Sequence, residues 1–143
     1  MRKLMRWLKF AGFTGLVLAT ALACNLTTTA PQSQFSNDGA IVFIIAPENN
    51  TIYAENILIT LYAAAHDPAG QVNSIEFRVD GIPLETVQSA SAQGQAYLEA
   101  QVNWQTAGVS GHRITAEAYR VDGASLGVVD RRVEVVSSGS FAQ

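Results

Sequence analysis

The sequence predicts an all-β sandwich, and two observations support this fold class. Polar and apolar residues alternate along several short runs, among them Ile57 to Ala65 and Ile75 to Val79. Because neighbouring side chains of a strand point to opposite faces, such runs are typical of half-buried strands. Turn-forming residues separate the runs, as in 66–70 and in Asp80-Gly81. A sheet with one apolar face needs a second layer to cover it, so we expect two packed sheets.

Length and charge limit the function classes. A chain of 143 residues is typical of one domain with short accessory segments. Its first nine residues contain four basic residues and no acidic one, whereas the remainder has five arginines, twelve acidic residues and no lysine, a net charge of −7. Binding to nucleic acid depends on clustered basic residues. We therefore expect no nucleic-acid partner.

The N-terminal segment has the three parts of an export signal. Residues 1–9 are positively charged, Phe10 to Ala23 is an uncharged apolar run, and Ala21-Leu22-Ala23 provides small residues for cleavage. The run is shorter than the roughly 20 residues that an ordinary membrane span requires. Residues 1–23 are therefore predicted to be a helical signal peptide.

The only cysteine of the chain, Cys24, follows this segment directly. Residues 21–24 resemble the lipobox of bacterial lipoproteins, in which lipid is attached to the cysteine and the signal is cut just before it. Ala21 stands where that motif usually has leucine. The alternative, cleavage by the ordinary signal peptidase after Ala23, leaves a free thiol on an exported protein, which oxidising compartments disfavour. The resemblance implies lipid on Cys24 and attachment to the outer face of the cell membrane or to another envelope membrane.

A polar segment rich in Thr, Gln, Ser and Asn then runs from Asn25 to Gly39. Such a segment cannot bury enough apolar surface to offset its loss of conformational entropy. Residues 24–39 are thus predicted to be a disordered tether with a root-mean-square span of roughly 20 to 24 Å. The sandwich is expected at 40–136, and a flexible tail at 137–143.

Seven short strands are expected within the sandwich. Val42 and Ile44 are predicted to face the core, as are Phe77 and Trp104, and Pro83 restricts its strand to a sheet edge. Seven strands with turn signals at this spacing are typical of an immunoglobulin-like sandwich. The expected strands are 41–45, 57–65, 75–79, 82–87, 96–104, 114–119 and 128–136.

Residues 41–136 also resemble the bacterial immunoglobulin-like domains of cell-envelope and secreted proteins. The similarity rests on a Pro that ends the first strand, an Ala–Asp–Gly turn, a hairpin ending in Asp-Gly, a Trp late in a strand, and Gly-His at the next strand. These residues are Pro47, then Ala65, Asp67 and Gly70, then 75–81, Trp104, and Gly111-His112. The resemblance implies a fold but no single function, because such domains serve as spacers, interaction units or carbohydrate-associated modules.

The residues give little indication of catalysis. His66 and His112 are the only histidines, and no G-x-S-x-G or paired-carboxylate pattern accompanies them. We expect a structural role for His112 at a strand start, and place His66 and Asp67 in a loop. Asp67 and Asp122 are expected at the same end of the sandwich, but they lack the ligand spacing of calcium loops. The sequence predicts neither an enzyme nor a metal or cofactor.

Aromatic residues are the better candidates for binding. Tyr62 and Tyr97 point outward from strands that are expected to be neighbours, so they form an exposed pair on which a sugar ring or a protein could stack. Alternatively, they are a cross-strand pair that stabilises the sheet by about 0.2 to 1 kcal/mol.

Two functional hypotheses follow. The first is a lipid-anchored interaction or spacer module that presents the sandwich to an envelope protein, and the alternative is a domain that binds carbohydrate or cell-wall polymer. The loops 66–71, 88–95 and 122–126 are expected to form the working pole, since loops on a rigid scaffold commonly carry binding sites. Asn49-Asn50, Asp80-Gly81 and 107–111 are expected at the opposite pole.

Overall fold

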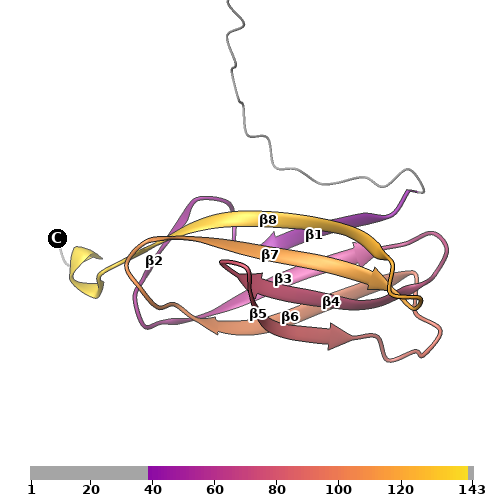
Figure 1. Ribbon diagram of the computed structural model, residues 1–143. Coiled ribbons are helices and arrows are strands. Elements are labelled where there is room, and N and C mark those ends of the chain that lie inside the picture. Colours follow the sequence, from indigo (N-terminus) through magenta and orange to yellow (C-terminus); the bar gives the residue numbers. More distant parts are fainter. Residues whose placement is uncertain (1–38, 142–143) are drawn as a thin grey trace, which may run out of the picture.

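The computed structural model describes residues 39–141. Its strands form two layers, a three-stranded sheet of order β1-β3-β6 and a five-stranded sheet of order β2-β8-β7-β4-β5 (Figure 1). The elements are β1 (Ile41–Ala46), β2 (Thr51–Ala54), β3 (Leu58–His66), β4 (Val72–Val79), β5 (Ile82–Gln88), β6 (Tyr97–Gln105), β7 (Gly111–Arg120), β8 (Ser125–Val136) and the 3-10 turn η1 (Ser138–Phe141). The predicted immunoglobulin-like sandwich is confirmed.

The core lies between the two sheets, where the inward residues of each strand meet. Along β6, exposed and buried residues alternate at every position, as the period of two requires. Phe77 is fully buried and Trp104 is 8% exposed, and Val42 and Ile44 are buried as well. The inward orientation predicted for these four residues is therefore confirmed.

The hairpin between β4 and β5 follows the predicted turn chemistry. Asp80 and Gly81 have φ angles of 53° and 81°, and a type I′ turn requires positive φ at both central positions. β5 is the last strand of its sheet, so Pro83 lies at an edge, as predicted.

Two features of the strands differ from the sequence-based expectation. β2 was not predicted, and it pairs with the last part of β8 in parallel. His66 was placed in a loop, but it is the last residue of β3, opposite Ile41 on β1 and Tyr97 on β6. The loop assignment was wrong because neighbouring strands on both sides continue the hydrogen-bonded ladder through this position.

The described chain begins and ends at opposite poles of the sandwich (Figure 1). Gly39 lies so close to the β3–β4 loop that a Cβ there would be 3.5 Å from Cγ of Pro68. At the other pole, the Ser138 hydroxyl donates a hydrogen bond of 3.1 Å to the Glu55 carbonyl. The chain therefore enters the sandwich at the pole that carries the 66–71 loop. Within residues 39–141, no helix is long and apolar enough to cross a membrane.

Candidate binding surfaces

The predicted tyrosine pair lies on the outer face of the three-stranded sheet, on the adjacent strands β3 and β6. The register places Tyr62 opposite Gln101 and places Glu99 opposite Ala64. The Tyr97 hydroxyl donates a hydrogen bond of 2.9 Å to Glu99 Oε1, and the Tyr62 side chain is hydrogen-bonded to the same carboxylate. Glu99 therefore connects the two phenols.

These hydrogen bonds fix the protonation states of the cluster. The hydrogen bond to Glu99 raises the pKa of Tyr62 to about 12, and a hydrogen bond to the same carboxylate raises the pKa of Tyr97. In turn, the hydrogen bonds from Tyr62 and Tyr97 lower the pKa of Glu99. At neutral pH the cluster thus consists of one ionised carboxylate and two neutral phenols that donate to it.

The tyrosine rings do not stand upright on this face. Tyr62 and Glu99 are diagonal neighbours on β3 and β6, because Tyr62 is opposite Gln101 and Ala64 is opposite Glu99. Ala64 points outward and is nevertheless fully buried, and Phe43 lies opposite it on β1. Since alanine cannot bury itself on an outer face, the larger side chains around it cover it. The outer face around Ala64 is thus closely packed.

Asp67 serves the structure of the loop pole. It is 1% exposed and accepts hydrogen bonds from Arg120 Nε at 3.0 Å and from the backbone N–H of Ala69 at 3.0 Å. The Arg120 hydrogen bond, together with backbone N–H donors, outweighs burial and lowers the pKa of Asp67. The carboxylate thus joins the β3–β4 loop to the end of β7 and has little surface for a ligand.

The three loops expected at one pole do meet there. The Val121 N–H donates to the Gln71 carbonyl at 3.2 Å, and Val72 forms a bridge with Gln95. Asp122 is exposed and accepts a hydrogen bond of 2.9 Å from the Ala124 N–H within its turn. No group of three or more metal-ligating side chains is found in the part of the chain that the structure describes.

At the opposite pole, His112 has three polar partners and one aromatic neighbour. Its Nδ1 lies 2.7 Å from Asp80 Oδ2, and its Nε2 lies 2.9 Å from the Gly108 carbonyl and 3.1 Å from Ser110 Oγ. The ring also packs edge-on against Trp104, with a centroid distance of 5.4 Å.

Serine, histidine and aspartate in this order are the residue types of a hydrolase triad. A carbonyl oxygen only accepts hydrogen bonds, so Nε2 carries a proton, and Nδ1 carries one toward Asp80. Burial lowers the pKa of His112, but the Gly108 carbonyl and Asp80 outweigh it, so the pKa is raised. Because Nε2 donates its hydrogen to the Gly108 carbonyl, it has no lone pair available to accept the Ser110 proton. His112 therefore holds the pole together, in agreement with the structural role that the sequence suggested.

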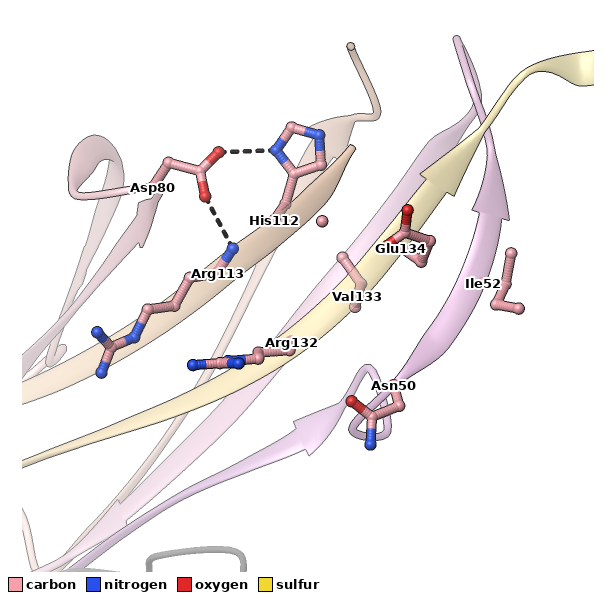
Figure 2. Close-up of a pocket in the computed structure, with 9 residues that line it drawn as sticks. Asn50, Ile52, Asp80, His112, Arg113, Arg132, Val133 and Glu134 are labelled. Carbon is pink, nitrogen blue, oxygen red and sulfur yellow. Dashed lines mark hydrogen bonds and ion pairs between the residues drawn. The ribbon is translucent and has the colours of Figure 1, made fainter. Parts of the chain in front are cut away.

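A groove of about 550 Å³ lies beside this histidine, over the ends of β7 and β8 (Figure 2). Arg113 and Arg132 are direct cross-strand partners on its wall, and Arg113 also forms an ion pair of 2.9 Å with Asp130. Asp80 and Glu134 line the same groove. The groove therefore carries charges of both signs.

The sequence identified some of these residues and missed others. Tyr62 and Tyr97 lie on the predicted face but four register positions apart, because Tyr62 is opposite Gln101 and Tyr97 is opposite His66. Glu99, which lies between them, was not singled out, although its place two residues after Tyr97 on an alternating strand was a visible signal. The contact between Asp80 and His112 spans 32 positions and had no local signal. Cys24 lies outside the described residues, so its lipidation stays a prediction.

The fold and its surfaces define a β-sandwich module of the immunoglobulin-like class. The family described as "Bacterial Ig domain" matches residues 41–116, more than half of the chain. This chain therefore belongs to the bacterial Ig domain family. No curated protein matches it.

Solved structures of low sequence identity share the fold. The fibronectin(III)-like modules of Clostridium thermocellum CbhA are 24% identical, with a TM-score of 0.56, and the match covers 67% of this chain and 97% of theirs. A CARDB domain from Pyrococcus furiosus is 14% identical, with a TM-score of 0.55, over 68% of this chain and 94% of its own. A crystal structure of that CARDB domain contains di-metal ions and has a TM-score of 0.54 at 15% identity, with 69% of this chain and 94% of that chain covered.

Proposed function

We propose that this chain is a lipid-anchored, non-catalytic interaction module of the bacterial cell envelope that contacts its partner through the outer face of β1, β3 and β6. The observation that carries the proposal is the Tyr62–Glu99–Tyr97 cluster. These aromatic side chains belong to the outer face of the sheet, and Tyr97 is 44% exposed. Tyrosine provides a large and rigid contact area at a low cost in conformational entropy.

The anchor supports the same proposal. The lipobox resemblance implies lipid on Cys24, and the chain enters the sandwich beside Pro68. The loop pole therefore adjoins the tether, while the outer sheet faces run along the sides of the molecule (Figure 1). A side face stays accessible to envelope components in more orientations of the tethered domain than the tethered pole does.

Two kinds of partner fit a module of this type. An envelope protein is the first, as the sequence suggested, and a polysaccharide is the second. A specific observation favours the second: the outward side chains of β6 are mainly neutral hydrogen-bonding groups, with Glu99 as the only charged one.

Site-specific photo-crosslinking in cells tests the working face. A benzophenone amino acid placed at Gln101 reports on the outer face, one at Ala69 on the loop pole, and one at Ile52 on the region of the opposite groove. We expect Gln101 to give the main crosslinked species, whether protein or glycan. Capture from Ala69 alone would instead support the loop pole as the working surface and would contradict the proposal.

A further inference from the structure

The outward side chains of β6 form a continuous row along the edge of the three-stranded sheet. Every second residue of this strand is exposed, in the order Tyr97, Glu99, Gln101, Asn103 and Gln105. At about 3.4 Å per residue, the row is roughly 27 Å long. Such a length suits an extended polymer better than a small molecule.

The chemistry of the row favours a neutral, hydroxylated ligand. Three of its five members are amides, which donate and accept hydrogen bonds without carrying charge. Glu99 is the only acidic residue of β1, β3 and β6, and these strands contain neither lysine nor arginine. Residues after Lys9 carry a net charge of −7. An anionic polymer would therefore be repelled. A basic partner could pair only with Glu99, whose carboxylate already accepts hydrogen bonds from two phenols.

The aromatic part of the face is organised for stacking. Tyr62 extends diagonally from β3 toward Glu99 on β6, and Tyr97 leans along its own strand toward the same carboxylate. Rings held along the sheet expose their faces, which stack on apolar surfaces such as the C–H face of a sugar ring. An ionised carboxylate has about four acceptor positions, so Glu99 retains two for ligand hydroxyls.

From this arrangement we infer that the outer face of β1, β3 and β6 binds a neutral polysaccharide laid along β6. Tyr97 stacks against a sugar ring at one end of the row, and Tyr62, which is opposite Gln101 on β3, stacks against another ring near its middle. Gln101 and Asn103 form hydrogen bonds with sugar hydroxyls. Glu99 positions the two tyrosines. The inference rests on the proposed function for the choice of face and adds the class of ligand.

Affinity electrophoresis of the full chain in detergent micelles tests this inference. The native gels contain a neutral polymer, namely hydroxyethylcellulose, galactomannan or glycol chitin. Carboxymethylcellulose serves as the anionic counterpart of hydroxyethylcellulose. We expect at least one neutral polymer to retard the protein and carboxymethylcellulose to retard it less. Tyr62→Ala and Tyr97→Ala should each weaken the retardation about tenfold, the effect of losing an aromatic contact.

A tyrosine of the other sheet provides a matched control. Tyr119 is half-buried on β7, and its hydroxyl lies 3.5 Å from Glu76 Oε2, so Tyr119→Ala also removes a tyrosine with a carboxylate neighbour but leaves β6 intact. We expect this variant to be retarded like the wild type. Circular dichroism melting shows that each variant is folded before its mobility is compared.

Several outcomes would overturn the inference. These are no retardation by any of the three neutral polymers, unchanged retardation of both Tyr62→Ala and Tyr97→Ala, or stronger retardation by carboxymethylcellulose. Crosslinking from Gln101 to a protein without retardation by polymers would refute the polysaccharide and leave the proposed working face intact. Retardation by a polymer together with cellular crosslinks only from Ala69 would refute the proposed face in the envelope.

Discussion

Two polar contacts, one at each pole, connect residues that are far apart in the sequence. Asp67 and Arg120 are 53 positions apart, and Asp80 and His112 are 32 apart. Each contact joins the connection between two consecutive strands, β3–β4 or β4–β5, to β7 of the five-stranded sheet. The first contact depends on the ionised form of Asp67 and the second on the protonated form of His112. Single substitutions and changes of pH therefore both test these contacts.

The buried carboxylate of Asp67 is expected to be a large contributor to stability. Asp67→Asn removes the charge that Arg120 faces, and breaking a buried pair costs about 3 to 5 kcal/mol in the free energy of unfolding. Urea unfolding at pH 7 measures this loss. Asp122→Asn is the matched control, because this exposed turn residue should change the free energy by less than about 0.5 kcal/mol. Equal midpoints for wild type and Asp67→Asn would contradict the structural role.

The pH dependence of the same pair has a definite sign. The folded-state pKa of Asp67 is lowered below the value of about 3.9 in an unfolded chain. Its stabilisation is therefore present above about pH 4 and is lost as the pH falls through the folded-state pKa. The difference in unfolding free energy between wild type and Asp67→Asn should shrink over this acidic range. A difference that stays constant down to pH 2 would contradict this assignment.

The stabilisation by His112, at the other pole, depends on pH with the opposite sign. Its folded-state pKa is raised above the value of about 6.5 in an unfolded chain. Its stabilisation is complete below about pH 6.5 and is lost as the pH rises through the raised pKa. Melting temperatures of the wild type should fall across this range, and those of His112→Gln should fall less. His66→Gln is the control, and a wild-type profile in His112→Gln would contradict the prediction.

At the scale of elements, the strands divide their residues between one core and two outer faces. β6 does this at every position, with Leu98, Ala100, Val102 and Trp104 inward and the polar row outward. β4 contributes Ile75 and Phe77 to the core, both fully buried. The same alternation therefore builds the hydrophobic core and the candidate binding face.

Truncation of the large core residues tests this division. Phe77→Ala and Trp104→Ala should each cost about 3 to 5 kcal/mol, a large part of the 5 to 15 kcal/mol that is typical of a domain. Urea unfolding measures the loss. Ile82→Ala on β5 is the control, because Ile82 is 71% exposed and should lose less than about 0.5 kcal/mol. Melting of Phe77→Ala at the wild-type temperature would show that the inward orientation matters little.

At the scale of the whole molecule, the position of the chain's entrance relates the sandwich to its proposed anchor. Gly39 lies at the loop pole, and η1 lies at the other pole. A tether of roughly 20 to 24 Å would keep the loop pole nearest to the membrane. The side faces and the groove beside His112 would then extend away from it.

Replacement of Cys24 tests the anchor. A single acyl chain holds a protein only reversibly, whereas two chains give stable attachment, so Cys24→Ala should move the protein from the membrane fraction to the soluble exported fraction. Its melting temperature should not change, because β1 begins at Ile41. Fractionation after a high-salt wash measures the shift. Retention of Cys24→Ala in the membrane fraction would show that another segment, such as Phe10 to Ala23, anchors the chain.

The sequence by itself determined the features that depend on neighbouring residues. Alternation with a period of two predicted seven of the eight strands in the described residues and the inward side of Phe77 and Trp104, and Asp80-Gly81 predicted the hairpin. It also predicted that Tyr62 and Tyr97 point outward. These features are local because the strand pleat and the turn geometry are set within a few residues.

Only the tertiary structure decided which residues meet across strands. The pairing of β2 with β8, the full burial of Ala64 on an outer face, the sharing of Glu99 by two tyrosines, and the pairing of Asp67 with Arg120 all depend on strand order and register. Register is fixed by the packing of two whole sheets and by turn geometry together, and a shift of one residue would turn every side chain to the other face. Packing, rather than any local motif, therefore assembled the candidate binding face.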